Sequence, residues 1–256
     1  MQSVFITGAS SGLGRALAAE YAAQGARLGL LGRRRDQLQA LADSLPGEHH
    51  IYVVDVRDRG ALHKAAADFL AVCGNKVDIV VASAGISAGT LTEEVEDFAV
   101  FKAIVDTNLL AMVATFEPFV APMKVAGGGA LVGVASVAGI RGLPGAGAYS
   151  SSKAAVIAYC ESLRLELAQE GIDVVTIAPG YVRTAMTAQN PYSMPFLMSA
   201  DEFARRAVKA IDQGVSYRVI PWPMGLVSRL MRLLPNWLYD RLARNAPRKP
   251  RHPLDS

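Results

Sequence analysis

Short apolar runs alternate with helix-length segments along most of this chain, and few folds accommodate that order. The runs lie near residues 3–7, 26–32, 50–56, 77–85, 129–136, 172–180 and 216–221. The segments between them have the length and periodicity of helices and lie near 13–24, 34–45, 59–73, 93–126, 149–170 and 200–213. Strands separated by helices form right-handed βαβ units, which build a parallel sheet covered on both faces. The sequence therefore predicts an α/β fold with a Rossmann-like, doubly wound parallel sheet of seven strands.

Composition favours one domain in a reducing compartment. With 256 residues, 51% of them hydrophobic, the chain can bury a large sheet, and we expect a single domain over 1–256. Cys73 and Cys160 are too few and too far apart for a disulfide framework. The first strand begins by Ser3, so no standard export signal is expected, and no stretch of 18 uncharged apolar residues predicts a membrane-spanning helix. The predicted location is the cytoplasm.

A glycine-rich loop directly follows the first strand and precedes an alanine-rich helix. The sequence "TGASSGLG" spaces Gly8, Gly12 and Gly14 as GxxxGxG, with Ser10, Ser11 and Leu13 between and beside them. A strand that turns sharply into a helix needs glycine for the turn, for close approach of a pyrophosphate and for helix packing. Glycines alone would be weak evidence, but this position at the start of the βαβ series predicts a dinucleotide site.

The second strand ends without the acid that NAD-binding sites commonly place there. Gly32 occupies the expected place, and Arg33 and Arg34 follow. Guanidinium groups suit a 2′-phosphate, so NADP(H) is the predicted cofactor, with mixed preference left open. Asp55, at the end of the third strand and next to Val56, is expected to accept a hydrogen bond from the adenine amine.

"YSSSK" places Tyr149 and Lys153 one helical turn apart on the same face. A nearby ammonium favours the phenolate, so the pair predicts general acid–base chemistry beside a nicotinamide. Ser136 ends an apolar strand 13 residues earlier and is expected to hold the substrate oxygen. Asn108 lies where the helical pattern of 93–126 is interrupted, and its side chain is expected to support a proton relay toward Lys153.

Taken together, these motifs resemble the short-chain dehydrogenase/reductase family over residues 3 to about 220. The resemblance implies that Tyr149 is the acid/base, that Lys153 lowers its pKa and binds the nicotinamide ribose, that Ser136 orients the substrate and that Asn108 supports the relay. It also implies homodimers or homotetramers formed through the long central helices. The cofactor-binding residues predicted are Gly8, Ser10, Ser11, Gly12, Leu13, Gly14, Arg33, Arg34, Asp55, Val56, Ala84, Gly85, Asn108, Tyr149, Lys153, Pro179, Gly180, Val182 and Thr184.

Two departures from the family pattern bear on the site. The family usually has Asn-Asn-Ala-Gly where this chain has Ala82-Ser83-Ala84-Gly85, which removes two side-chain amides from that turn. The chain also lacks the glycine-rich ending of the fatty-acid ketoacyl reductases after the seventh strand. This second difference argues against the commonest substrate class.

Two segments outside the alternation remain to be assigned. Residues 181–199 are rich in Met, Pro, Tyr and Asn, which predicts either a substrate lid for a lipophilic molecule or a loop packed on the core or a partner subunit. Residues 221–256 form a basic amphipathic extension that suits a cover over the active site, a subunit contact or a peripheral membrane contact. Nucleic acid is not predicted as a partner, because no recognised module accompanies the charge.

The predicted function is that of an NADP(H)-dependent oxidoreductase that interconverts a carbonyl and an alcohol, in the reductive direction on a lipophilic ketone or aldehyde. Two alternatives stay open, namely a catalytically idle cofactor sensor or scaffold and a NAD-dependent alcohol dehydrogenase. No metal is predicted, because the histidines have neither metal-ligand spacing nor acidic or thiol partners; they are His49, His50, His63 and His252.

Overall fold

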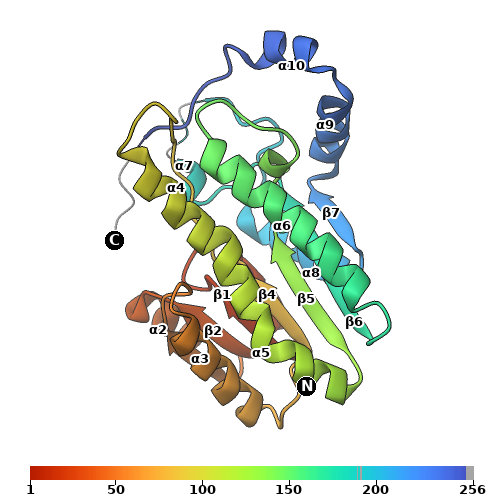
Figure 1. The fold of residues 1–256 in the computed structure, drawn as a ribbon. Coiled ribbons are helices and arrows are strands. Elements are labelled where there is room, and N and C mark those ends of the chain that lie inside the picture. Colours follow the sequence, from red (N-terminus) through yellow and green to blue (C-terminus); the bar gives the residue numbers. More distant parts are fainter. Residues whose placement is uncertain (189, 191, 252–256) are drawn as a thin grey trace.

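A single parallel sheet forms the centre of the molecule in the computed structural model, which describes residues 1–188, 190 and 192–251 (Figure 1). Its strands are β1 (Ser3–Thr7), β2 (Arg27–Gly32), β3 (His49–Val53), β4 (Ile79–Ala82), β5 (Gly129–Val134), β6 (Ile172–Pro179) and β7 (Tyr217–Ile220). Their order is β3-β2-β1-β4-β5-β6-β7, and all neighbours are parallel. The predicted seven-stranded doubly wound sheet is confirmed, and the order reverses between β1 and β4, where such folds bind ligands.

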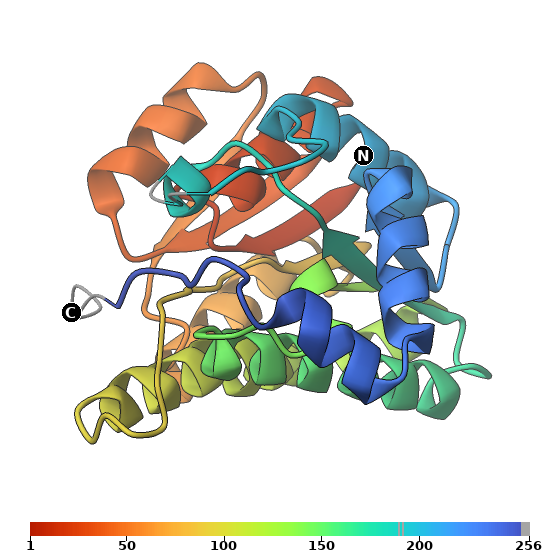
Figure 2. The same cartoon turned by 90° about the horizontal axis from the view of Figure 1, so that it is seen from above.

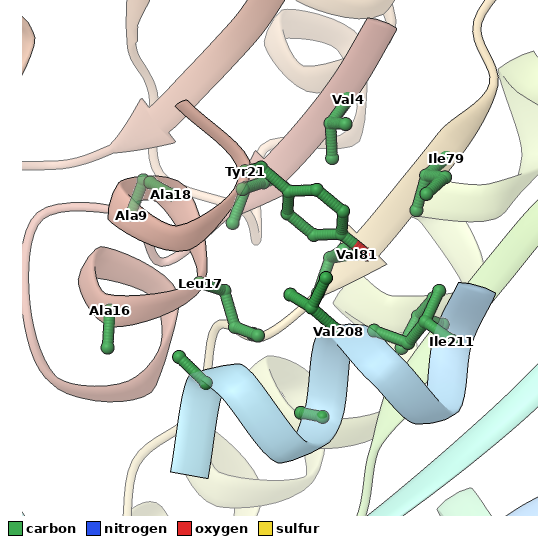
Figure 3. Packing of buried hydrophobic residues seen from close by; sticks show 14 of the residues in the cluster. Val4, Ala9, Ala16, Leu17, Ala18, Tyr21, Ile79, Val81, Val208 and Ile211 are labelled. Atoms are coloured by element: carbon green, nitrogen blue, oxygen red, sulfur yellow. The ribbon is translucent and has the colours of Figure 1, made fainter. Parts of the chain in front are cut away.

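Helices cover both faces of this sheet. They are α1 (Gly12–Ala23), α2 (Arg35–Ser44), α3 (Arg59–Val72), α4 (Asp97–Val105), α5 (Ala111–Ala126), α6 (Gly147–Glu166), α7 (Ala185–Ala188), α8 (Ala200–Asp212), α9 (Trp222–Leu233) and α10 (Asn236–Ala243). On one face α1, α2 and α8 share a core with the strands, and Figure 3 shows Tyr21 and Leu17 of α1 facing Val208 and Ile211 of α8. On the other face α3, α5 and α6 share a second core.

The second core contains an aromatic cluster that fixes β1. The ring of Phe5 lies 5.5 Å from the ring of Phe69 and 5.1 Å from that of Phe119, centroid to centroid. All three side chains are fully buried. This cluster joins α3 and α5 to the strand that carries the glycine loop, so the loop starts from a rigid base.

The long helical stretch between β4 and β5 is continuous but contains one wide turn. Residues Asp106–Leu110 form a π-helical turn between α4 and α5, as the predicted interruption near Asn108 indicated. Such turns are single widened turns and occur frequently at functional sites. By length and hydropathy Asp97–Ala126 would suit a membrane span, yet Met112, Phe116 and Phe119 are buried in the core, as in a core helix of a folded domain.

The segment 181–199 leaves the sheet and returns to it at a tied base. Val182 and Met198 pair and are both buried, and the amide of Arg183 donates to the carbonyl of Met198 at 2.9 Å. The described part of the tip is more accessible, with Phe196 about half exposed. Residues 189 and 191 lie outside the described residues. The base is therefore a loop packed on the core, and the tip carries the apolar side chains predicted for a lid.

The basic extension docks on the loop between Ser136 and Tyr149. Arg141 donates to the carbonyls of Met231 and Leu234, at 3.1 and 2.9 Å, and lies 4.0 Å over the ring of Tyr239. After α10 the chain runs back across the molecule between α7 and α6 (Figure 2). The described part of the extension therefore packs against the loop between Ser136 and Tyr149, and residues 252–256 lie outside the description.

Candidate active site

The glycine loop forms a cradle that side chains would close. Gly8 has a φ of +70°, and a Cβ there would lie 2.8 Å from the Cα of Ala84. A Cβ at Gly14 would lie 2.8 Å from the carbonyl carbon of Gly8 and closer still to its oxygen. The cradle opens at the start of α1, whose first amides lack acceptors within the helix, and Ser11 forms no side-chain cap there. Free amides at a helix N-terminus beside a glycine cradle fit the pyrophosphate of a dinucleotide.

The residues predicted for the nicotinamide end lie next to this cradle. The methyl carbon of Thr184 would be 3.6 Å from a Cβ at Gly12, so the segment that follows β6 reaches the glycine loop. The amide of Gly180, beside Pro179, donates to Ile220 at 2.8 Å, and Val182 is buried. The structure therefore brings both ends of the predicted cofactor site together at one edge of the sheet.

The substituted turn after β4 is held by a different group. The amide of Ala84 donates to the hydroxyl of Thr7 at 3.3 Å. The hydroxyl of Ser83 is buried without a hydrogen-bond partner in the described residues. A buried, unpaired hydroxyl is a costly feature that a bound group would relieve, which supports a ligand at this turn. The turn therefore has a hydrogen bond from Ala84 to Thr7 in place of the missing side-chain amides, while the Ser83 hydroxyl has no partner in the described residues.

Two arginines of the predicted ribose site differ in their contacts. Arg34 donates to the hydroxyls of Ser10 and Ser11, at 3.2 and 2.8 Å, and both serines belong to the glycine loop. Arg33 is exposed and lies close enough to Asp55 to help lower the pKa of that carboxyl. Arg34 therefore lies against the glycine loop, and Arg33 lies near Asp55.

Asp55 has a partner that sequence reasoning missed. Its carboxylate accepts from Arg57 in bidentate fashion, with contacts of 3.1 and 2.6 Å, and this hydrogen bonding holds its pKa below the ordinary value. Val56, beside it, is buried. An adenine amine would have to share an acceptor with Arg57. The i, i+2 spacing of an acid and an arginine after a strand was the only sequence signal.

Tyr149, Lys153 and Ser136 meet at the carboxyl ends of β5 and the first turns of α6. Lys153 is buried, donates to the carbonyl of Val134 at 2.8 Å and lies with its Nζ 5.9 Å from the centroid of the Tyr149 ring. Burial lowers the pKa of Lys153 to about 8. Ser136 caps a short 3-10 turn (Val137–Gly139) by accepting from the amide of Ala138 at 3.2 Å. The three side chains predicted to act together are adjacent in the fold.

The pKa of Tyr149 differs from the sequence-based expectation. Burial raises it, and the hydrogen bond from Ser136 opposes that rise. Desolvation of the phenolate therefore outweighs the hydrogen bond from Ser136. The phenol stays protonated at neutral pH, which is the form that donates a proton to a carbonyl.

Asn108 is fully buried and fixed by three hydrogen bonds. Its Oδ1 accepts from the amide of Ile86 at 2.8 Å, and its Nδ2 donates to the carbonyl of Ile86 and to the hydroxyl of Ser152, each at 3.0 Å. A side chain at Gly85 would lie 3.2 Å from Oδ1 and 3.6 Å from the Nζ of Lys153. Asn108 thus lies beside Lys153 and ties the loop after β4 to α6.

Two surface hollows lie at the edge of the sheet opposite Tyr149, around Asp78 and Gly127, and neither is lined by Ser136, Tyr149 or Lys153. Within residues 1–188, 190 and 192–251 the structure groups no three His, Cys, Asp or Glu side chains for a metal, and His252 lies outside that range.

A Rossmann-type sheet, a glycine cradle at a helix start and a tyrosine beside a buried lysine are typical of the class of nicotinamide-dependent oxidoreductases. A family model described as short chain dehydrogenase matches residues 2–194. The chain belongs to the short-chain dehydrogenase/reductase family, whose members use nicotinamide cofactors.

Similar proteins share the family but differ in what their names describe. An uncharacterized oxidoreductase of Myxococcus xanthus is 38% identical over 95% of this chain and 96% of its own. A 2-dehydro-3-deoxy-L-rhamnonate dehydrogenase (NAD(+)) of a Sphingomonas strain is 37% identical over 73% of this chain and 75% of its own. The crystal structure of a 3-ketoacyl-ACP reductase from Sinorhizobium meliloti is 29% identical, covers 88% of this chain and 99% of its own, and has a TM-score of 0.78.

Proposed function

We propose that this protein reduces a ketone or aldehyde to an alcohol with NADPH, and that Tyr149 is the proton donor. The observation that carries the proposal is the adjacency of Tyr149, Lys153 and Ser136 next to the glycine cradle. NADPH, when bound, supplies the hydride. The oxidation of an alcohol is the reverse reaction at the same groups.

The roles of the side chains follow from their surroundings. The Ser136 hydroxyl holds the carbonyl oxygen against the phenol of Tyr149, which is protonated because burial raises its pKa. The cationic Lys153 stabilises the phenolate that forms when that proton leaves. Asn108 keeps the loop after β4 in place beside Lys153 through its hydrogen bonds to Ile86.

NADPH is favoured over NADH by the arginines at the ribose end. Arg34 lies against Ser10 and Ser11, Arg33 is exposed beside Asp55, and neither position carries the acid that would repel a 2′-phosphate. The Sphingomonas relative, which carries NAD(+) in its name, keeps the NAD-dependent dehydrogenase as the second candidate. We expect Arg34→Ala to weaken NADPH binding about 10- to 100-fold and to leave NADH binding nearly unchanged.

A lipophilic substrate is supported by the lid segment. Tyr192 of that segment is close enough to Tyr149 for the two phenols to influence one another, and it packs edge-on to Tyr181 with ring centroids 6.4 Å apart. Phe196 and Met186 are exposed near the same loop. Apolar side chains beside the acid–base group suit a substrate with an apolar body.

The test is NADPH oxidation by the purified protein against aldehydes, ketones of increasing chain length, steroids and quinones. Tyr149→Phe should lower turnover about 10²- to 10⁴-fold while NADPH binding changes less than twofold. Turnover that is equal in Tyr149→Phe would refute the proposal. Tight NADPH binding without turnover on any substrate would instead favour the sensor or scaffold.

The assembly, the location and the membrane contact stay predictions. A homodimer or homotetramer through the central helices is supported by Phe98 and Leu110, which are exposed on α4 and the π turn. A peripheral membrane contact through the extension is supported by Trp222 and Trp237, which are 71% and 68% exposed.

A further inference from the structure

The chain after α10 forms a strap, residues 246–251, that is clamped over the loop following β4. The amide of Gly89 donates to the carbonyl of Pro250 at 2.9 Å. Arg251 donates to both carboxylate oxygens of Asp97, at 2.9 and 3.2 Å, and lies 3.2 Å from Glu94. A backbone hydrogen bond and two ion pairs therefore fix the last two residues of the strap, Pro250 and Arg251, on this loop and on the start of α4.

The strap carries one ammonium group to the catalytic tyrosine. The Nζ of Lys249 lies 5.8 Å from the centroid of the Tyr149 ring, almost the same as the 5.9 Å from Lys153. It donates to the hydroxyl of Ser87 at 2.7 Å, and Ser87 lies two residues beyond Gly85 of the cofactor site. Tyr149 thus has two ammonium groups beside it, from α6 and from the strap.

Lys249 has no acidic partner in the described part of the chain. The acids nearest along its path, Glu94 and Asp97, both pair with Arg251. Lys249 is half-buried, and this burial lowers the pKa of its ammonium group to about 8. A poorly solvated ammonium without a counter-ion is disfavoured unless an anion binds it. Ser87 offers a neutral oxygen and does not supply that charge.

We propose that Lys249 binds an anionic group of the substrate, a carboxylate or a phosphate-like group, and so determines substrate specificity. The proposal rests on the proposed carbonyl reduction, because it places the anion within a few bonds of the carbonyl held by Tyr149 and Ser136. Together with the apolar lid, it describes an oxo acid with an acidic end at the strap and an apolar chain toward 181–199. Lys249 is a specificity residue, while Tyr149 remains the proton donor.

The first experiment measures binding without turnover. Calorimetry on the full chain saturated with NADP⁺ compares 3-oxooctanoate, its methyl ester and 2-oxoheptylphosphonate, none of which can be reduced by the oxidised cofactor. The acid should bind wild type about 10- to 100-fold more tightly than the ester, since hydrogen bonds to charged groups are worth that much. The phosphonate reports whether the site prefers a carboxylate or a phosphate-like group.

Two variants test the ammonium group in different ways. Lys249→Gln deletes its charge. Gly89→Ala keeps the charge but displaces the strap, because a Cβ at Gly89 would overlap the carbonyl oxygen of Lys249 and lie 2.9 Å from that of Pro250. Lys249→Gln and Gly89→Ala should each reduce the preference for acid over ester to less than threefold. Lys249→Arg keeps the charge and should retain most of that preference. Two matched controls should keep the preference. They are Lys209→Gln, at an exposed residue of α8, and Gly147→Ala, where a Cβ meets nothing within 4 Å.

Several results would overturn the proposal. Equal affinity of acid and ester for wild type, or no binding of either, excludes an anion site at Lys249. An equal loss for both ligands in Lys249→Gln would mean that the residue only shapes the pocket. Faster NADPH oxidation with the ester in Lys249→Gln and Gly89→Ala would make the strap a block on the site. Acid-selective binding without any turnover by wild type would refute the carbonyl reduction and leave the anion site standing.

Discussion

Replacing Gly14 by alanine should damage the cofactor cradle without touching any catalytic side chain. A Cβ at this position lies 2.8 Å from the carbonyl carbon of Gly8, and its other neighbours, the oxygen of Gly8 and the Cα of Ala9, are also backbone. Ordinary contacts begin at 3.4 Å. No side chain can turn away, so either the loop or the start of α1 has to move by roughly 1 Å.

That movement sets the size of the effect. A misplacement of about 1 Å can cost an enzyme about 10²-fold in rate. We expect NADPH affinity to fall by a similar factor, because the same loop has to hold the pyrophosphate in position. Overpacking of this kind costs about 1–3 kcal/mol in the free energy of unfolding, which lowers Tm by roughly 2–12 °C for a domain of this length. Fluorescence titration of NADPH and thermal unfolding by circular dichroism measure the two quantities.

Gly147→Ala is the matched control. It adds the same methyl group at the first residue of α6, where a Cβ meets nothing within 4 Å, and should leave both quantities unchanged. If Gly14→Ala bound NADPH within twofold of wild type at an unchanged Tm, the cradle would not be the cofactor site. A lower Tm with normal binding would mean that the loop relaxes away from the ligand.

Three further predictions concern the pH profile, the core and the extension. At saturating NADPH, reduction should slow as pH rises through about 8, because burial lowers the pKa of Lys153 to that value and its positive charge is then lost while Tyr149 is still protonated. Lys153→Arg should shift the alkaline limb of the pH–rate profile to higher pH, and an unshifted limb would assign it to another group. Phe5→Ala should lower the free energy of unfolding by about 3–5 kcal/mol in urea titrations, since the ring fills the space between Phe69 and Phe119. A loss below about 1 kcal/mol would contradict the claim that this aromatic cluster gives the glycine loop a rigid base. Arg141→Ala should expose 231–245 to faster limited proteolysis while core stability changes by about 1 kcal/mol or less, and an unchanged cleavage rate would show that other contacts hold α9 and α10.

The sequence predicted the sheet well because local patterns determine it. Apolar runs between helical segments identified β1 to β7, and the interruption near Asn108 corresponds to the π turn. The catalytic residues follow from spacing, since one helical turn fixes Tyr149 relative to Lys153.

Contacts that depend on side-chain placement could not be predicted in this way. Arg57, two residues from Asp55, occupies the carboxylate to which position alone gave an adenine role. The raised pKa of Tyr149 depends on the packing around the phenol, which no local pattern reports. Lys249 belongs to a basic stretch without periodicity, and its approach to Tyr149 arises only because Arg251 and Pro250 fix the strap on a loop more than 150 residues earlier.

The π turn makes the number of residues, as well as their identity, part of this site. Each residue of a regular α-helix turns the chain by about 100°, and a π turn accommodates one residue more than a regular turn. The wide turn therefore absorbs one residue while α4 and α5 keep their faces toward the core. Removing one residue from Asp106–Leu110 should close it to a regular turn and leave Phe116 and Phe119 buried, but should turn the Asn108 side chain away from Ile86 and Ser152. A deletion here should therefore spare the core and remove the support that Asn108 gives to the site.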